Sequence, residues 1–158
     1  MKAFSFFLVL FIIFIIALVI MNSGVLRFFN INPNLIFSLI FAFIALRVQY
    51  AVVASLLLLL FCLSLAFYPF WIVEFSLLCF IGFLSLFIRS KLTGNSLSDA
   101  LIISSFGSLF FSLCLWFFSH SSIDIYQIVL QIIYNDICVL IFVLVMQPLI
   151  RRGGILKV

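Results

Sequence analysis

Residues 4–21 read FSFFLVLFIIFIIALVIM, and this unbroken apolar run decides the class of fold. A helix that crosses a bilayer needs about 20 predominantly apolar residues, and this run contains no polar side chain larger than that of Ser5. A cleaved signal peptide is the alternative, because Lys2 precedes the run. The apolar core of such a peptide is shorter, about 7 to 15 residues, and ends at a small-residue cleavage site, which residues 22–24 (Asn-Ser-Gly) do not resemble. We therefore expect the segment to be retained as a membrane anchor.

The composition of the whole chain extends this expectation to nearly every residue. Hydrophobic residues make up 68% of the 158 positions, whereas charged residues make up only 8%. A soluble domain has about 25% charged residues, so a soluble protein, a disordered chain and a coiled coil are excluded. Six spanning helices would use about 120 residues and leave too few for a separate soluble domain. The composition predicts an all-α integral membrane protein with one transmembrane domain, residues 1–158.

Turn and polar residues divide the chain into six apolar segments. The predicted transmembrane helices are residues 4–21, 33–46, 51–68, 71–88, 97–118 and 126–150. Pro33 suits the first turn of the second helix, where a missing N–H is tolerated. Ser96 and Asp99 have the spacing of a capping box at the start of the fifth helix.

The basic residues divide very unequally between the two sides of the membrane. With a cytoplasmic N-terminus, one basic residue, Arg27, lies outside. The other seven of the eight lie on the inner side: Lys2, Arg47, Arg89, Lys91, Arg151, Arg152 and Lys157. Cytoplasmic loops hold the excess of Lys and Arg, so we expect both termini in the cytoplasm. Four aromatic residues are expected at the outer ends of the helices, where the membrane interface favours them: Tyr68, Trp71, Trp116 and Tyr126.

The formal net charge of +4 does not predict nucleic-acid binding. The basic residues are spread singly over short loops, whereas a nucleic-acid-binding surface concentrates them on one folded face. We expect them to set the topology and to contact anionic lipid headgroups. The lipid bilayer is thus the first partner that the sequence predicts.

Catalytic and metal-binding motifs are absent from the sequence. The four cysteines are distributed one per helix without a C-x-x-C pair, so we interpret them as small packing residues: Cys62, Cys79, Cys114 and Cys138. The single histidine, His120, falls in a predicted outer loop and is interpreted as a solvated residue. The sequence therefore predicts no enzyme, no metal site and no cofactor.

Polar residues within the helices are the candidates for function, because a polar group at membrane depth needs a partner or a reason. Gln127, Gln131 and Asn135 recur four residues apart and share one face of the sixth helix, and Asp136 is adjacent to that face. Asp136 lies about 15 Å along the helix from Tyr126, near the bilayer midplane. Two interpretations stay open for this polar face: hydrogen bonds between helices, or a ligand pocket or partner-docking face.

Two further features complete the candidate residues. Glu74 lies one turn inside the outer end of the fourth helix, and it is either a shallow carboxylate that reaches water or part of the same polar face. On the fifth helix, small residues recur four positions apart: Ala100, Ser104, Ser108 and Ser112. Such a pattern lets helices approach closely. We expect this face to pack against another helix, in this chain or in a partner.

Two stretches of the sequence resemble the rod shape-determining protein MreD family. The first, INPNLIFSLIFAFIALR, has the family's Pro-Asn-Leu start and terminal Arg at Pro33, Asn34, Leu35 and Arg47. The second, YNDICVLIFVLVMQPLIRR, resembles the family's last helix, with Asn135 and Pro148 at matching places. The length, the helix count and the basic loop after the fourth helix are also similar.

The resemblance implies a function. It implies a noncatalytic inner-membrane subunit of the bacterial cell-elongation machinery, which acts with MreC, actin-like MreB and the peptidoglycan synthase pair to maintain rod shape. The family is similar in architecture to the substrate-binding membrane subunits of energy-coupling-factor vitamin transporters, and such a subunit is the alternative. Those subunits usually have an A-x-x-x-A motif in the first helix, whereas residues 4–21 contain only Ala17. A third interpretation, an intramembrane enzyme, has no candidate residues apart from Glu74 and Asp136.

Overall fold

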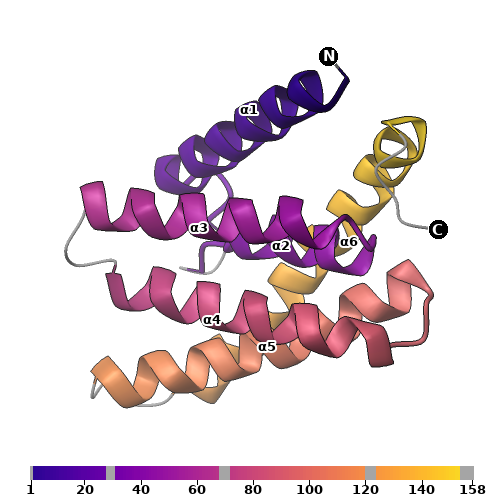
Figure 1. Ribbon diagram of the computed structural model, residues 1–158. Coiled ribbons are helices and arrows are strands. Elements are labelled where there is room, and N and C mark those ends of the chain that lie inside the picture. The colour runs from indigo at the N-terminus through magenta and orange to yellow at the C-terminus, as the bar shows by residue number, and fades with distance from the viewer. Residues whose placement is uncertain (1, 28–30, 68–71, 120–123, 154–158) are drawn as a thin grey trace.

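The computed structural model describes residues 2–27, 31–67, 72–119 and 124–153, and it is entirely helical apart from turns (Figure 1). Its elements are α1 (Lys2–Ser23), α2 (Leu35–Ala45), α3 (Tyr50–Phe67), α4 (Ile72–Ile88), the short 3₁₀-helix η2 (Arg89–Lys91), α5 (Ser96–Ser119) and α6 (Ile125–Gly153). The described part of the chain contains no β-strand. The expectation of an all-α fold is confirmed, and the helix bounds lie within a few residues of the expected ones.

Within the residues that the structure describes, three helices are long and apolar enough to cross a membrane: residues 73–91, 96–118 and 125–150. The other apolar helical segments are shorter, at residues 11–21, 35–45 and 50–62. Large apolar side chains remain exposed along the outer faces of these helices, such as Phe87 and Phe106, which are 79% and 70% exposed. Such outer faces are stable in lipid and unfavourable in water, so this is the architecture of a membrane-embedded protein.

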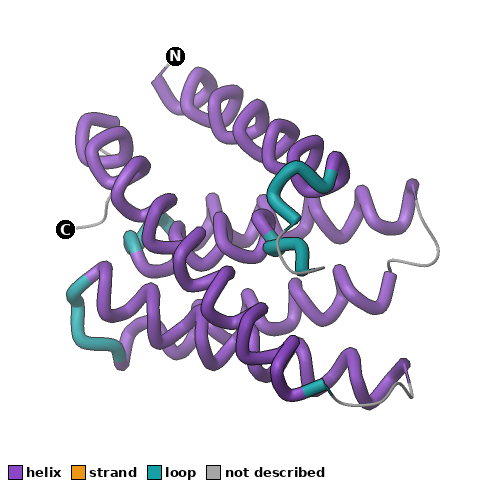
Figure 2. The backbone as a smooth tube through the Cα atoms, turned by 180° about the vertical axis from the view of Figure 1, so that it is seen from behind, coloured by secondary structure: helices purple, strands orange, loops and turns teal. Residues whose placement is uncertain are grey.

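Helix α2 forms the centre of the bundle (Figures 1 and 2). Every one of its 11 residues is buried, and it contacts each of the other five α-helices. Its composition permits burial on every side, since only Ser38 among these residues has a polar side chain, and this hydroxyl donates to the backbone carbonyl of Asn135. A helix of this length rises only about 16 Å. It is shorter than a helix that spans a bilayer by itself, and it serves as the core around which the longer helices pack.

The start of α2 differs from the expectation that Pro33 lies in the first helical turn. Asn34 is the N-cap, and its side-chain Oδ1 accepts the backbone N–H of Phe37 at 3.0 Å. Pro33 therefore precedes the cap. An Asn side chain satisfies one of the unpaired N–H groups of the first turn, which Pro cannot do, and this bond moves the helix start to Leu35.

Helix α2 ends in a turn that is usually made by glycine. The Arg47 N–H donates to the carbonyl of Ile44, and the Val48 N–H donates to that of Phe43, both at 3.1 Å. This is the Schellman pattern, in which the residue after the cap takes a left-handed backbone. Arg47 has this backbone, with a φ of 56°. The turn directs the chain from buried α2 into α3.

The connection from α2 to α3 meets the connection from α4 to α5. The buried Arg89 guanidinium donates to the carbonyl of Val48 at 2.6 Å and lies 3.7 Å from the ring centroid of Tyr50. On the other side, the Arg47 guanidinium lies 3.9 Å from the Asp99 carboxylate. The two connections that the charge pattern assigns to the inner side thus form one end of the bundle.

Asp99 organises this end in a way that the expected capping box does not describe. Its carboxylate accepts from the backbone N–H groups of Thr93 and Gly94, at 2.9 and 3.1 Å, and from the Thr93 hydroxyl at 2.7 Å. The cap of α5 is Asn95, whose Oδ1 accepts the N–H of Leu97. The predicted capping box of Ser96 and Asp99 is therefore wrong. Asn95, one residue before Ser96, is the N-cap and supplies the capping oxygen.

The small-residue face of α5 packs inside this chain. Ala100, Ser104 and Ser108 are buried, with at most 1% of each exposed. Gly107 is the point of closest approach, because a Cβ atom there would lie 2.6 Å from the Phe41 ring and 3.1 Å from the Phe37 ring. The face therefore lets α5 approach α2, and α6 packs along the same helix.

Candidate functional site

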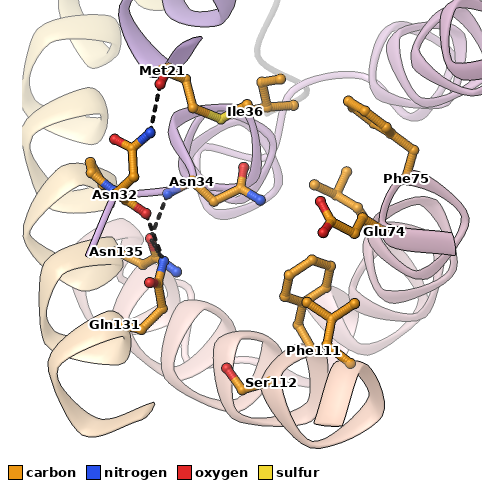
Figure 3. A pocket seen from close by; sticks show the side chains of 13 residues that line it. Met21, Asn32, Asn34, Ile36, Glu74, Phe75, Phe111, Ser112, Gln131 and Asn135 are labelled. Atoms are coloured by element: carbon orange, nitrogen blue, oxygen red, sulfur yellow. Dashed lines mark hydrogen bonds between the residues drawn. The ribbon is translucent and has the colours of Figure 1, made fainter. Parts of the chain in front are cut away.

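A cavity of about 360 Å³, lined by both polar and apolar side chains, lies at the end of the bundle opposite Arg89. Figure 3 shows it from close by. Glu74 in the first turn of α4 borders it, whereas Arg89 follows the last turn of that helix. The lining comes from the end of α1, the segment before and into α2, and from α4, α5 and α6: Met21, Asn32, Pro33, Asn34, Ile36, Glu74, Phe75, Leu78, Phe111, Ser112, Leu115, Gln131 and Asn135. Five chain segments that are distant in sequence therefore converge on one space.

Asn135 holds one wall of the cavity together. Its Oδ1 accepts the backbone N–H of Asn34 at 3.0 Å, and its Nδ2 donates to the Ser108 hydroxyl at 3.1 Å. The Gln131 amide donates to the Asn32 carbonyl at 3.2 Å and to Asn135 Oδ1 at 3.4 Å. Each donor or acceptor that is paired here would otherwise be left in an apolar environment. These bonds are contacts between helices of the kind that the first interpretation of the polar face predicts.

Glu74 forms the facing wall. Figure 3 shows its carboxylate and the Asn34 amide directed toward each other across the cavity, with Phe75 and Phe111 beside Glu74. Glu74 is exposed, and none of the described residues donates a hydrogen bond or an ion pair to it. The Oδ1 of Asn34 is occupied by the cap of α2, so its Nδ2 is the group that faces the cavity. The carboxylate is therefore accessible to a ligand.

The residues of the expected polar face do not all reach this cavity. Gln131, Asn135 and Glu74 line it, whereas Gln127 is exposed and is not among the lining residues. Asp136 turns toward α5, where its Oδ2 accepts the Ser105 hydroxyl at 2.7 Å, and its Oδ1 is buried without a hydrogen-bond partner in the described chain. The reason is helical geometry, because Asp136 is rotated by about 100° from Asn135. Of the small-residue face, Ser112 alone borders the cavity.

The sequence reasoning did not single out the segment before α2 as a cavity wall. Asn32 and Asn34 stand on either side of Pro33 in that segment, and both line the cavity. The Asn32 amide also donates to the Met21 carbonyl at the end of α1. The signal was present as a group of asparagines directly before a wholly apolar helix. Their orientation depends on α6, which lies about a hundred residues later.

Other expected residues are distributed elsewhere. Tyr68, Trp71, His120 and Lys157 lie outside the described residues. Trp116 and Tyr126, near the end of α5 and the start of α6, are exposed. The cysteines are free, and among them Cys79 and Cys138 are buried packing residues, whereas Cys62 is exposed. Within the described ranges, no three His, Cys, Asp or Glu residues are grouped as metal ligands.

The lining of the cavity combines polar and apolar groups. Its lining contains one carboxylate, four side-chain amides and one hydroxyl, together with apolar and aromatic groups. A pocket with a few converging polar groups on an apolar lining is typical of a small-molecule site. Comparison with protein-family models, with curated proteins and with solved structures finds no match.

Proposed function

We propose that this chain is a noncatalytic inner-membrane subunit of the bacterial cell-elongation machinery, of the kind found in the MreD family. One observation carries the proposal. The two stretches that resemble the family, around Pro33 and Asn135, pack against each other, and the Asn34 N–H donates to Asn135 Oδ1. The two stretches are distant in sequence but are joined in the core, so the fold depends on both of them together.

The proposal includes a topology of six membrane crossings with both termini in the cytoplasm. Its support is the separation of the two ends of the bundle. Arg47, Arg89 and Lys91 lie in the connections at one end, where positive charge marks the cytoplasmic side. The asparagines before α2 and Glu74 lie at the opposite end.

A scaffold role follows from where contacts with other proteins can form. Helix α2 is enclosed by the other helices, and the described connections are short. Partners would therefore pack on the exposed apolar sides of the outer helices, within the bilayer. We propose the single spanning helix of an MreC-like protein as the direct partner, with MreB and the peptidoglycan synthase pair in the same assembly.

Affinity purification from bacterial membranes tests the scaffold proposal. A tagged chain should copurify an MreC-like protein and peptidoglycan synthesis proteins. Recovery of an ATPase module with its transmembrane coupling subunit would contradict the proposal. Conversion of Glu74 to Gln and Asp136 to Asn in one variant should leave cell shape intact, because a scaffold needs no catalytic carboxylate.

The cavity favours a second candidate, a substrate-binding membrane subunit of an energy-coupling-factor vitamin transporter. Its specific support is the space of about 360 Å³ with polar groups from Asn34, Glu74 and Gln131. This candidate predicts that the purified chain retains a water-soluble vitamin and copurifies the ATPase module. Purified chain without a bound vitamin, together with elongation proteins, would exclude it.

A further inference from the structure

We propose that the cavity binds a primary ammonium group that has an acceptor oxygen close by, as in the ethanolamine headgroup of a phospholipid or in a free amino alcohol. The inference goes beyond the scaffold role and does not depend on it. It shares its cavity with the second candidate function but names a different ligand chemistry.

The charge of the lining selects a cation. Among the described residues that line the cavity, Glu74 is the only ionisable one. The basic residues Arg47, Arg89 and Lys91 lie at the opposite end of the bundle. Arg27 lies in the loop between the lining residues Met21 and Asn32, but it is exposed, does not line the cavity and forms no described ion pair with Glu74. The Glu74 carboxylate is exposed at the cavity and has no described partner, so a cationic ligand can form an ion pair with it there.

The hydrogen-bonding groups favour an ammonium that keeps its N–H bonds. A primary ammonium has three donors, whereas a quaternary ammonium has none. Glu74 offers two carboxylate oxygens as acceptors for these donors, and no described residue donates to them. Phe75 and Phe111 beside Glu74 are aromatic groups that also attract a cation.

The wall across from Glu74 offers a hydrogen-bond donor, and this is why we expect the ligand to have an acceptor oxygen near its ammonium group. Asn34 uses its Oδ1 to cap α2, so its Nδ2 faces the cavity as a donor. A ligand that spans from the carboxylate to this amide therefore needs a donor at one end and an acceptor at the other. An ethanolamine phosphate has an ammonium two carbons from an ester oxygen, and a cavity of about 360 Å³ accommodates a group of this size.

Native mass spectrometry of the purified full chain tests the proposal. The protein in detergent is given equal amounts of phosphatidylethanolamine and phosphatidylcholine with identical acyl chains, which differ only in the three methyl groups on nitrogen. We expect the wild-type chain to retain phosphatidylethanolamine about tenfold more, a ratio that corresponds to about 1.4 kcal/mol. Glu74→Gln, which has nearly the same shape, should abolish the preference.

Two variants serve as controls. Asp136→Asn removes a carboxylate from the membrane region without changing the lining, so the preference should persist. Asn34→Ser keeps a capping oxygen at the start of α2 but removes the amide donor, and it should weaken retention without removing the preference. Thermal unfolding of each variant shows whether the fold is intact, and the lipid ratio is compared between variants that unfold like the wild type.

Free ethanolamine and O-phosphoethanolamine distinguish the two sources of the ammonium. If either one displaces the bound lipid and raises the unfolding temperature of the wild type but not of Glu74→Gln, the free compound is a ligand. If neither does, while the lipid preference holds, the lipid headgroup is the ligand. Equal retention of both lipids, or an unchanged preference in Glu74→Gln, would overturn the proposal. Such a failure would leave the copurification result for the scaffold role untouched.

Discussion

Asn135 has a polar side chain that connects three helical segments of the described bundle. It joins α6 to the start of α2 through the Asn34 N–H and to α5 through the Ser108 hydroxyl. Its position on a helix face was readable from the four-residue spacing with Gln131. Its partners were not, because they lie on helices that only tertiary packing brings together.

Replacing Asn135 with Ala should destabilise the protein by about 1–3 kcal/mol, since it leaves the Asn34 N–H and the Ser108 hydroxyl unpaired in the interior. Unfolding by denaturant in detergent micelles measures the change. Gln127→Ala is the matched control, because it removes an amide from an exposed position of the same helix, and it should alter stability by less than about 0.5 kcal/mol. Equal losses in the two variants would contradict the role given to Asn135.

Gly107→Ala should also destabilise the protein, by about 1–3 kcal/mol, because overpacking displaces neighbours in a filled core. The added Cβ would lie 2.6 Å from the Phe41 ring. Phe41→Leu in the same chain should recover part of the loss, since the smaller side chain makes room. Unfolding temperatures of the single and double variants measure the coupling. Purely additive effects would show that the two residues do not meet as described.

At the scale of the element, α2 shows what an apolar pattern can and cannot predict. The run from Leu35 to Leu46 predicted a helix, and the helix was found. The pattern did not predict complete burial, because a wholly apolar helix is equally suited to lipid contact and to a protein core. Its end was marked by Arg47, a residue that rarely makes a left-handed turn.

Arg47→Gly and Arg47→Ala should differ in stability although both remove the guanidinium. Gly adopts a left-handed backbone without a steric penalty, whereas Ala pays about 1–2 kcal/mol there. We expect the Gly variant to be more stable than the Ala variant by about 1 kcal/mol in unfolding experiments. Because both lose the contact with Asp99, the comparison isolates the backbone. A more stable Ala variant would be inconsistent with the φ of 56° at this position.

At the scale of the whole molecule, the two ends of the bundle differ both in their charged residues and in their packing. The connections that contain Arg47 and Arg89 meet through the Arg89 bond to Val48. The cavity lies at the other end, beside the first turn of α4. This unequal distribution of charge between the two ends is the basis of the orientation that we propose for the chain in a membrane.

Reporter fusions test that orientation. Alkaline phosphatase, which is active only outside the cytoplasm, should be inactive when fused after Lys91 and active when fused after Asp124. The physical reason is the retention of Lys and Arg on the cytoplasmic side. Replacement of Arg47, Arg89 and Lys91 in the two basic connections by neutral residues should reduce the difference in phosphatase activity between the two fusions. The opposite pattern of activity would invert the proposed topology.

The sequence by itself determined that the chain is helical, membrane-embedded and divided at the observed places. These properties depend on local quantities, namely the transfer of apolar side chains into lipid, the hydrogen bonds within each helix and the turn chemistry between helices. The tertiary structure decided that α2 is the core, that Gly107 is its closest contact and that Asn34, Glu74 and Gln131 surround one cavity. In lipid, nearly every apolar face is acceptable, so helix pairing is set by close packing and by hydrogen bonds between residues as distant as Asn34 and Asn135.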